Sequence, residues 1–326
     1  MLKEISIEII RKCPNRCIHC SSFSTEKCTE IIPFDLFRDV VIGAKRLGLR
    51  TVCFSGGEPF LHPNIVQMIK FVHEQGLRSF VYSSGIYMDN GKMCAAIPNY
   101  ILDQIRDKVT KIIYNIEAAE ESTYNIIMGT KGYFGFLSES IHRTVEAGII
   151  VEGHFVPNKI NACQIEKTLK YCTDLGVSQV SFLRLVIHGR AYENRKKLEL
   201  SKDESDMVKQ VLTKIKNENT YNIRIGVPLL GETEECHCEA ANGKLNIRYD
   251  GKVFPCEVFK NNQVKSVIDC EPGNIFNESI EEIYTNSEYL KRVRELVRLH
   301  SCEYNCEQCI GQYYIKSIMG EESNDK

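Results

Sequence analysis

The chain has 326 residues, 43% hydrophobic and 26% charged, which is ordinary for a globular protein with one large α/β domain and a small second one. Its formal net charge of −2, from 41 basic and 43 acidic residues, gives no reason to expect a nucleic-acid partner. No apolar run could span a bilayer, and the N-terminal MLKEISIEII lacks the features of a secretory signal, so we expect no membrane partner and a cytoplasmic location.

Strand-like and helical segments alternate over residues 1–190. Short β-rich runs are predicted at 5–10, 51–54, 79–82, 111–116, 149–156 and 177–186. Helical periodicity is found between them at 34–48, 63–76, 134–147 and 161–175. This alternation is typical of parallel βαβ units, and six units are too few for a closed eight-stranded barrel. The predicted fold is therefore α/β, an open, partial (β/α)6 TIM-like barrel whose reactive residues lie at the C-terminal ends of the strands.

The pattern changes beyond about residue 190. The stretch 191–235 is charged at its start and predicts a connecting helix and strand. Residues 244–259 predict a β-hairpin around an Asp-Gly pair, and 279–300 predict one amphipathic helix. We therefore expect a small C-terminal domain over 236–318, followed by a disordered tail at 319–326.

Fifteen cysteines are many for a chain of this length, and they are clustered. Cytosolic thiols stay reduced, so clustered cysteines indicate a metal or catalysis before disulfides. Cys13, Cys17 and Cys20 follow the first strand with the spacing Cys-x3-Cys-x2-Cys. The residues alone leave two alternatives open. One is zinc, with His19 or Cys28 as a fourth ligand, and the other is a [4Fe–4S] cluster that leaves one iron open to a small molecule.

A second motif, FSGGEPFL at 54–61, follows the next strand. Gly56 and Gly57 allow the backbone to approach a ligand closely, and Glu58 suits a ligand ammonium group. Alone, the motif could equally be an ordinary strand-to-helix turn. Because both motifs end successive parallel strands, they should meet at one rim of the barrel, which favours a single shared site.

In combination, the two motifs resemble those of the radical S-adenosylmethionine (radical SAM) superfamily. The resemblance covers about residues 4–190, and the residues that carry it are Cys13, Cys17, Cys20, Gly56, Gly57, Glu58 and Pro59. It implies that the three cysteines hold a [4Fe–4S] cluster whose open iron chelates SAM. One electron would then cleave SAM to methionine and a 5′-deoxyadenosyl radical, which takes a hydrogen atom from the substrate. The family usually has an aromatic residue before the third cysteine, where this chain has His19.

The same resemblance suggests further SAM-binding residues. Ser83 and Ser84 would lie near the ribose or the methionine carboxylate, and Arg184, near the end of the sixth strand, would meet that carboxylate. Asn115 and Glu117 stand where the family usually has the Ser and Asp of a Ser-x-Asp-Gly segment. The alternatives that involve no ligand are hydrogen bonding within a loop for the two serines and a surface ion pair for Arg184. No general base or radical quencher is predicted.

The C-terminal cysteines resemble the SPASM and twitch domains attached to many radical SAM enzymes, while a zinc ribbon is the alternative from the residues alone. Cys238 and Cys256 match the opening of the SPASM pattern, but only three closely spaced cysteines follow. The simplest interpretation of these cysteines is one auxiliary [4Fe–4S] cluster, because four thiolates complete one cubane. Its predicted ligands are Cys238, Cys256, Cys306 and Cys309, with Cys236 and Cys302 in reserve. The expected cofactors are thus two [4Fe–4S] clusters and SAM.

The resemblance predicts a radical SAM oxidoreductase or maturase but does not identify the substrate. We favour a ribosomally synthesised peptide that is crosslinked, epimerised or oxidised, because a SPASM-type domain most often accompanies peptide maturases. The alternative is a dehydrogenase or cyclase acting on a small-molecule metabolite. A third hypothesis is a non-catalytic iron–sulfur or zinc protein. Expected partners are an electron donor such as flavodoxin or ferredoxin and a separate leader-binding protein, because the first strand begins by residue 5.

Overall fold

The structure, a computed structural model, describes the chain except for residues 90–92, 227–228, 230–237, 262–267, 304–308 and 312–326. One large sheet contains the strands β1 (Glu4–Ile10), β2 (Thr51–Gly56), β3 (Arg78–Ser83), β6 (Lys111–Asn115), β7 (Val151–Phe155), β8 (Gln179–Phe182), β9 (Ile223–Ile225), β10 (Lys244–Ile247) and β11 (Val253–Phe254). A separate hairpin consists of β4 (Tyr87–Asp89) and β5 (Met93–Ala95). The order in the large sheet is β11-β10-β1-β2-β3-β6-β7-β8-β9, and every neighbouring pair is parallel except β10–β11.

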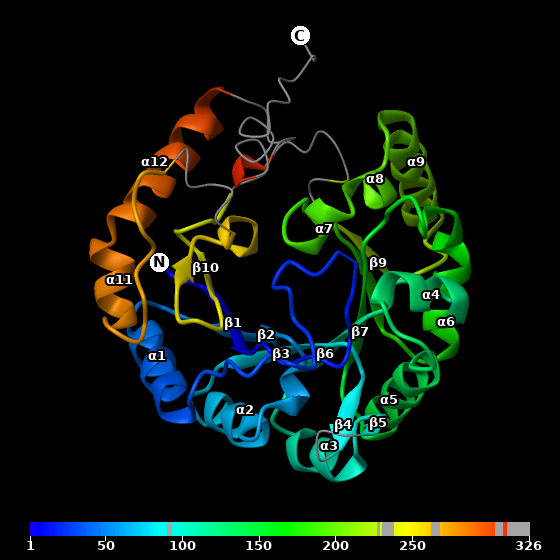
Figure 1. Cartoon of the computed structure of the whole chain (residues 1–326), viewed down its shortest axis with the longest axis horizontal. Coiled ribbons are helices and arrows are strands. Elements are labelled where there is room, and N and C mark those ends of the chain that lie inside the picture. The colour runs from blue at the N-terminus through cyan, green and yellow to red at the C-terminus, as the bar shows by residue number, and fades with distance from the viewer. Residues whose placement is uncertain (90–92, 227–228, 230–237, 262–267, 304–308, 312–326) are drawn as a thin grey trace.

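Helices cover the outside of this curved sheet (Figure 1). They are α1 (Phe34–Arg46), α2 (Ile65–Glu74), α3 (Asn99–Ile105), α4 (Glu121–Met128), α5 (Phe134–Glu146), α6 (Ile165–Asp174), α7 (Arg190–Glu193), α8 (Arg195–Leu198), α9 (Lys202–Glu218), α11 (Ile280–Asn286) and α12 (Glu288–Glu303). Three short 3-10 turns are η1 (Pro59–Leu61), η2 (Ala162–Gln164) and η3 (Glu257–Phe259).

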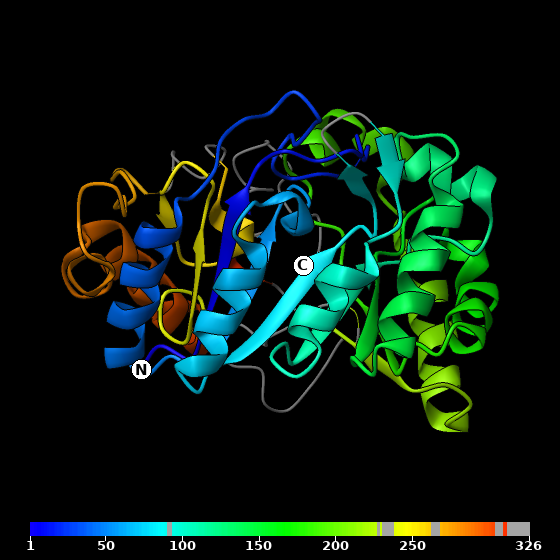
Figure 2. The ribbon, with the colours of Figure 1, turned by 90° about the horizontal axis from the view of Figure 1, so that it is seen from below.

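The hydrophobic core lies between the outer face of the sheet and these helices. Strand residues alternate between two faces, so Ile5, Ile7 and Ile9 of β1 all enter the core. Glu4 and Glu8 of the same strand point to the opposite, inner face. In Figure 2 the arrows of β1 and its neighbours point to one edge of the molecule, where the segment that follows β1 lies. The carboxyl ends of the strands thus meet at one rim.

The predicted partial barrel is confirmed. The six predicted strands correspond to β1, β2, β3, β6, β7 and β8, which are adjacent in the sheet in chain order. The last of them ends earlier than predicted, at Phe182, so residues 183–186 form a loop at the rim. Helices α3 and α4 and the β4–β5 hairpin were not predicted. The first of these helices begins directly after Pro98, and the second follows an extended residue, Glu120.

The predicted C-terminal hairpin exists as β10 and β11, and it extends the barrel sheet. Strand β10 pairs in parallel with β1, from Glu4 opposite Lys244 to Ile7 opposite Ile247. The backbone N–H of Lys3 also donates to the carbonyl oxygen of Gly243 (2.8 Å). The C-terminal part of the chain is therefore joined to the first strand by a continuous ladder of backbone hydrogen bonds.

The prediction of a single helix over 279–300 was wrong. The structure has two helices, α11 and α12, which are separated at Ser287. Ser287 has an extended backbone (φ −55°, ψ 118°), and its hydroxyl accepts a hydrogen bond from the N–H of Leu290 (3.4 Å). A serine that caps a new helix in this way ends the preceding one, because its own backbone leaves the helical region.

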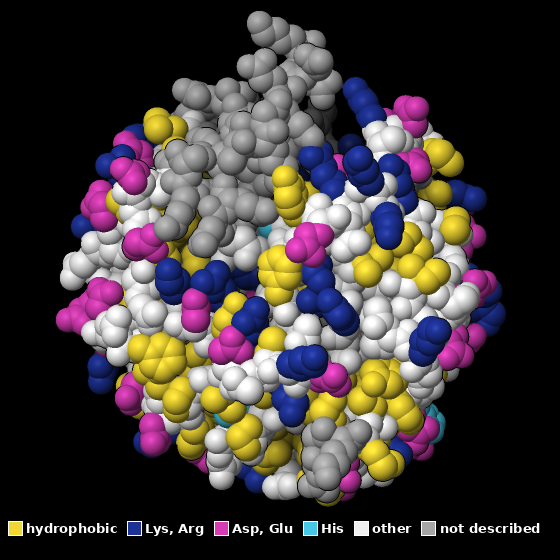
Figure 3. All heavy atoms as spheres, viewed as in Figure 1, with side chains coloured by type: hydrophobic (Ala, Val, Ile, Leu, Met, Phe, Trp, Pro, Cys, Tyr) yellow, Lys and Arg dark blue, Asp and Glu magenta, His cyan; other side chains and the backbone are white. Residues whose placement is uncertain are grey.

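No helix in the part of the chain that the structure describes is long and apolar enough to cross a membrane. On the face shown in Figure 3, basic and acidic side chains are intermixed, in agreement with the small net charge. The predicted tail, 319–326, lies outside the described residues.

Candidate functional site

The three N-terminal cysteines lie in the loop that follows β1, at the carboxyl end of the sheet. Cys13 is buried, whereas Cys17 and Cys20 are half-buried. The backbone N–H of Cys13 donates to the carbonyl oxygen of Thr25 (3.1 Å), and that of Cys20 donates to the carbonyl oxygen of Cys17 (3.2 Å). These bonds fold the loop back on itself.

Helix α4, absent from the predicted elements, holds one side of this loop. The backbone N–H of Arg16 donates to the carbonyl oxygen of Met128 (3.1 Å), the last residue of the helix. The sulfur of Met128 lies 3.7 Å from the sulfur of Cys17. Gly129 follows with φ +64°, and a Cβ atom there would lie only 2.2 Å from the carbonyl oxygen of Arg16. Glycine is therefore required for the helix end to approach the cysteine loop.

Arg190, in α7, holds the other side. Its side chain is 8% exposed; Nε donates to the carbonyl oxygen of Cys17 (2.8 Å) and Nη2 to that of Ser24 (2.9 Å). Its backbone N–H donates to the carbonyl oxygen of Cys20 (3.0 Å). No local sequence pattern identifies Arg190 as a functional residue, because its guanidinium reaches a carbonyl group 173 residues earlier in the chain.

Burial and mutual proximity raise the pKa values of the Cys13 and Cys17 thiols. Loss of contact with water is the largest cause for both, and the charges of neighbouring thiols add to it. Both thiols interact with that of Cys20, so the three lie in one region. Buried thiols of this kind stay protonated until a metal replaces the proton.

The arrangement fits a single zinc ion poorly. Among the residues that the structure describes, no three His, Cys, Asp or Glu side chains are arranged to hold one metal ion. Nε2 of His19 faces Oε1 of Glu117 at 3.5 Å, and the Cys28 thiol is 3.4 Å from the Thr25 hydroxyl. The Cys28 thiol thus has a protein partner, whereas Nδ1 of His19 makes no hydrogen bond in the described structure. Three thiolates that bind separate irons of a cubane need not converge on one point.

The two glycines after β2 bring their turn against the cysteine loop. Gly56 has φ +125°, and a Cβ atom on Gly57 would lie 2.0 Å from the carbonyl oxygen of Lys12. The N–H of Gly57 donates to the carbonyl oxygen of Ile10 (2.6 Å), and that of Glu58 donates to Lys12 (2.9 Å). The close approach expected from the Gly-Gly pair is thus present, and the group approached is the backbone that leads into Cys13. The two N–H groups are used within the protein.

The carboxylate of Glu58 is held by Ser83 and Ser84, which were predicted near the ribose or the methionine carboxylate of SAM. It is fully buried: Oε1 accepts from the hydroxyl of Ser83 (2.9 Å) and the N–H of Phe60 (3.2 Å). Oε2 accepts from the hydroxyl (2.6 Å) and the N–H (2.7 Å) of Ser84. Burial raises the pKa of Glu58, and the bonds from Ser84 and Ser83 oppose that increase. Three of the predicted residues therefore form one hydrogen-bonded group at the rim.

Glu117, which is buried, and His19, which is half-buried, form a second pair. Oε2 of Glu117 accepts from the N–H of Val156 (3.2 Å), whereas Oε1 has no hydrogen-bond partner in the described structure. Burial raises the pKa of Glu117 to about 8. Burial, together with the charge of Arg190, lowers the pKa of His19 to about 4. Both groups are therefore neutral at pH 7.

Asn115 and Arg184 complete the predicted SAM-binding set. Asn115 is the last residue of β6, in register with His154 of β7, and is half-buried. Arg184 lies in the loop after β8, and its Nε is buried without a hydrogen-bond partner among the described residues. A buried donor without a partner is costly, so this atom is available to an anionic ligand.

The inner face of the sheet also carries polar side chains. The hydroxyl of Tyr82 donates to the sulfur of Cys53 (3.8 Å), and its ring lies 5.3 Å from that of His154. Nε of Arg224 donates to the hydroxyl of Ser181 (3.0 Å). Burial, with the nearby Arg224 charge, lowers the pKa of His154 to about 3, so its ring is neutral. These groups form a polar layer on the inner face of the sheet.

Three of the four predicted auxiliary ligands lie together. Cys256 follows β11 and is half-buried, Cys309 is half-buried and Cys238 is exposed. The pKa of Cys256 is raised well above its usual value by burial, by Glu257 and by the thiols of Cys309 and Cys238. Cys306 and the reserve candidate Cys236 lie outside the described residues, as does the side chain of Cys302.

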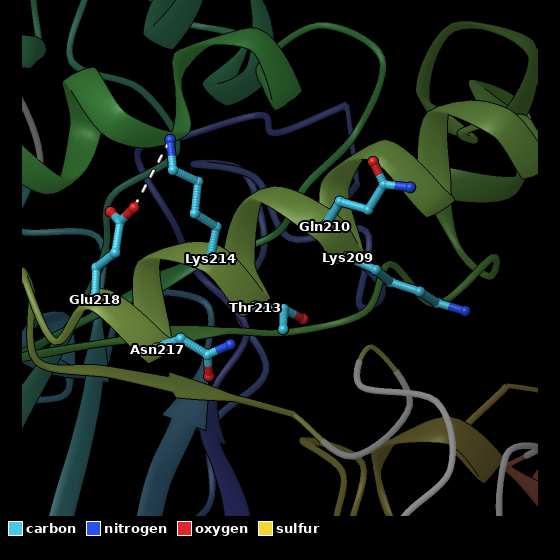
Figure 4. A pocket seen from close by; sticks show the side chains of 6 residues that line it. All are labelled: Lys209, Gln210, Thr213, Lys214, Asn217 and Glu218. Atoms are coloured by element: carbon cyan, nitrogen blue, oxygen red, sulfur yellow. Dashed lines mark ion pairs between the residues drawn. The ribbon is translucent and has the colours of Figure 1, made fainter.

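A shallow groove on α9 lies away from these sites. Its six lining residues are Lys209, Gln210, Thr213, Lys214, Asn217 and Glu218. They all come from one helix, and Lys214 pairs with Glu218 at 3.9 Å (Figure 4). The opposite face of the helix is the buried one, with Val208, Leu212 and Ile215. The groove is therefore part of the solvent-facing surface and does not involve the cysteines.

Two protein families match this chain. The radical SAM superfamily matches residues 7–172, and the SPASM iron–sulfur cluster-binding domain matches residues 236–310. Among curated proteins, the chain is 23% identical over 278 residues to the PqqA peptide cyclase of Gluconobacter oxydans, which covers 83% of this chain and 75% of that protein. It is 22% identical to the PqqA peptide cyclase of Methylobacterium nodulans over 285 residues, 86% of this chain and 72% of that protein.

Solved structures that share the fold include two with bound S-adenosylmethionine. SuiB of Streptococcus suis bound to S-adenosylmethionine superposes with a TM-score of 0.72 at 14% identity, over 91% of this chain and 68% of that one. The structure of anSMEcpe with bound SAM and a Cp18Cys peptide superposes with a TM-score of 0.66 at 14% identity, over 91% of this chain and 83% of that one. Because the superfamily model covers half of the chain and the SPASM model covers the C-terminal cysteines, the chain belongs to the radical SAM superfamily and is a radical SAM enzyme with a C-terminal SPASM domain.

Proposed function

We propose that Cys13, Cys17 and Cys20 hold the [4Fe–4S] cluster of the radical SAM domain and that the enzyme modifies a ribosomally synthesised peptide. The observation that carries the cluster assignment is the meeting of the cysteine loop with the Gly-Gly-Glu turn, through the 2.6 Å bond from Gly57 N–H to the carbonyl oxygen of Ile10. That meeting brings both family motifs to one rim of the barrel.

The residues around the three thiols fit an iron–sulfur cluster. Asn15 is 1% exposed, and neither polar atom of its side chain has a partner in the described structure. The hydroxyl of Tyr124 is likewise buried and unpartnered, and this residue interacts with the charges of Cys17 and Cys13. Buried polar groups are normally hydrogen-bonded, and the sulfur atoms of a cluster would supply acceptors here.

The remaining residues of the rim would bind and orient the cofactor. When bound, the cluster and SAM supply a 5′-deoxyadenosyl radical that takes a hydrogen atom from the substrate. Glu58, fixed by Ser83 and Ser84, would present its carboxylate and the adjoining backbone to the SAM ammonium group. The unpartnered Nε of Arg184 would bind the methionine carboxylate.

Asn115 and Glu117 would bind the ribose. Oε1 of Glu117 makes no hydrogen bond in the described structure and faces only Nε2 of His19 at 3.5 Å, and this supports its role, because a buried oxygen without a hydrogen bond can accept from a ribose hydroxyl. Since burial keeps Glu117 protonated at pH 7, this contact would add no buried negative charge.

The auxiliary cluster would be held by Cys238, Cys256, Cys306 and Cys309. The proximity of Cys256 to Cys238 and Cys309 supports this set. Four thiolates leave no open iron for a substrate, so this cluster would serve electron transfer. An electron donor such as flavodoxin or ferredoxin, a separate leader-binding protein and a cytoplasmic location are parts of the same proposal and rest on the sequence argument.

The peptide substrate is supported by the proteins that this chain resembles. The curated relatives are named PqqA peptide cyclases, and solved structures with this fold include SuiB bound to the precursor peptide SuiA and anSMEcpe bound to a peptide. On the inner face of the sheet, Arg224 of β9 is exposed, and its guanidinium offers hydrogen-bond donors that suit a peptide backbone.

The test is to incubate the reduced enzyme and SAM with peptides encoded beside its gene and to follow them by mass spectrometry. Loss of two hydrogens indicates crosslinking or oxidation, and deuterium incorporation from solvent at one Cα indicates epimerisation. If no encoded peptide changes, while a small metabolite is converted in proportion to 5′-deoxyadenosine, the dehydrogenase or cyclase alternative replaces the peptide proposal.

A further inference from the structure

A buried ionic contact joins the segment after Cys256 to the segment after Cys20. Lys260 follows η3 and is only 5% exposed, and its Nζ lies 2.6 Å from Oε1 of Glu8 and 3.0 Å from the hydroxyl of Ser22. The hydroxyl of Ser22 in turn donates to Oε1 of Glu8 (2.6 Å). We refer to Glu8, Ser22 and Lys260 as the rim triad.

The triad connects three distant parts of the chain at the rim of the barrel. Glu8 belongs to β1 and is 1% exposed, and Ser22 stands two residues after Cys20. Lys260 stands four residues after Cys256, on the SPASM side. A buried lysine and a buried glutamate stabilise each other, because the removal of either side chain leaves an unpaired charge that is shielded from water. The contact therefore fixes the position of the SPASM segment relative to the cysteine loop.

Other hydrogen bonds hold the same segments. The carbonyl oxygen of Lys260 accepts from Nη1 of Arg248 on the hairpin (2.6 Å). Nδ2 of Asn261 donates to the carbonyl oxygen of Ser21 (3.3 Å), and the Asn261 side chain also contacts Nδ1 of His188. Two consecutive residues of the SPASM domain thus bind the two residues that follow Cys20.

The backbone after Cys20 is held from the other side by α7. The backbone N–H of Arg190 donates to the carbonyl oxygen of Cys20 (3.0 Å). Gly189 has φ +60°, and a Cβ atom there would lie 2.6 Å from the carbonyl oxygen of Ser21. With α7 on one side and Lys260 on the other, the backbone that orients Cys20 has little freedom. Loss of the lysine would free one side of it.

We propose that Lys260 is a positioning residue that fixes the backbone after Cys20 and thereby couples the SPASM domain to the geometry of the radical SAM cluster. The inference rests on the proposed assignment of Cys13, Cys17 and Cys20 to that cluster. It extends the assignment by giving the SPASM domain an effect on SAM binding that does not require electron transfer between the clusters.

The experiment uses full-length, anaerobically reconstituted enzyme with Lys260→Met. Iron per chain, the SAM dissociation constant and the electron paramagnetic resonance (EPR) spectrum of the reduced protein are measured with and without SAM. Only a cluster with an open iron responds directly to SAM, so the SAM-induced spectral change reports on the radical SAM cluster. We expect wild-type iron content, an altered SAM-induced spectrum and at least fivefold weaker SAM binding.

The matched control is Lys252→Met, which removes the same charge from the same domain. Lys252 pairs with Glu271 at the surface (3.2 Å), and within the part of the chain that the structure describes its side chain makes no hydrogen bond or ion pair with the cysteine loop. We expect wild-type SAM binding and spectra for this variant. If the two lysine variants behave alike, net charge and not position is the cause, and the proposal is overturned.

The double variant Glu8→Gln, Lys260→Met separates positioning from stability, and it also serves if Lys260→Met does not fold. It leaves no unpaired buried charge, so thermal stability should recover while the altered SAM-induced spectrum persists. Recovery of both would make the triad merely structural and overturn the proposal. If instead the Cys13, Cys17 and Cys20 triple variant keeps the SAM-induced change, the cluster assignment itself fails. A wild-type response to SAM in Lys260→Met with normal iron content refutes only the coupling.

Discussion

The two cysteine regions of the enzyme are held in different ways. Around Cys13, Cys17 and Cys20, backbone and side-chain bonds come from the β2 turn, from α4 and from Arg190. In the SPASM region Cys256 is fixed at the end of β11, but Cys238 is exposed. We therefore expect the barrel site to be formed before a cluster binds, and the second site to depend more on its cluster.

The strongest test of this difference removes the ligands of each site in turn. Cys17→Ala should reduce 5′-deoxyadenosine formation to background, because a cubane with two protein thiolates left does not keep its redox state. Wild-type protein should hold about eight irons, which make up two cubanes. The triple variant of Cys13, Cys17 and Cys20 should hold about four, which make up one cubane. Iron analysis and dithionite-driven SAM cleavage check these expectations.

The converse variant, Cys256→Ala, should also lose about four irons but keep the SAM-induced EPR change, because the barrel site does not use this thiol. A triple variant that contains zinc in place of its residual iron would contradict the SPASM cluster assignment.

Gly129→Ala tests how far the barrel site is built in advance. The added Cβ would lie 2.2 Å from the carbonyl oxygen of Arg16 at a φ of +64°. Overpacking and left-handed strain together cost about 2–5 kcal/mol. The variant should lose thermal stability and radical-cluster content. Gly132→Ala is the control, because its φ is +76° but nothing lies within 4 Å of the added atom. Equal losses of thermal stability and radical-cluster content in both variants would show that left-handed backbone strain accounts for the effect. The approach of α4 to the cysteine loop would then make no contribution.

Glu58→Gln tests the hydrogen-bonded group at the rim. The amide has one acceptor oxygen in place of two, so the bonds from Ser83 and Ser84 cannot all persist. Loss of a charge-assisted bond should weaken SAM binding by about 1.5–3 kcal/mol, about ten- to hundredfold, with iron content unchanged. Equilibrium titration with SAM measures the effect. Unchanged affinity would assign Glu58 a purely structural role.

Capping serines provide the smallest and most closely matched comparison. Ser201 of the barrel side and Ser279 of the SPASM side each form a capping box, with the same 3.2 Å bond from the N–H of Glu204 or Glu282. Alanine at either position should cost about 0.5–2 kcal/mol in thermal unfolding. Only Ser279→Ala should also reduce retention of the auxiliary cluster. The same iron content in both variants would argue against cluster-dependent order in the SPASM region.

The strands and the cysteine motif were predictable because their signals are local. Apolar alternation in β1 and the spacing of Cys13, Cys17 and Cys20 can be recognised without knowledge of any distant contact. Both motifs follow strands that are neighbours in a parallel sheet, so their meeting at one rim also followed from topology.

The contacts that surround this rim were not predictable, because they depend on packing between distant segments. The bonds that Glu58 accepts from Ser83, Ser84 and Phe60 are an example, because two of these residues lie at the end of another strand and no local pattern indicates that they reach the carboxylate. The roles of Arg190 and Lys260 rest on bonds that span 173 and 252 residues. No sequence pattern distinguishes these two cations from the other 39 of the chain's 41 Lys and Arg residues.

The parallel pairing of β1 with β10 has a consequence for synthesis of the protein. Ile7 is opposite Ile247, so 240 residues separate two neighbours in the sheet. At about 5–20 residues per second, a ribosome needs about 12–48 s to make the stretch between them. During that time one edge of β1 lacks its final partner, and unpaired strand edges favour aggregation. The C-terminal hairpin therefore completes the sheet as well as contributing Cys256, and a chain that stops before β10 should be prone to associate through its first strand.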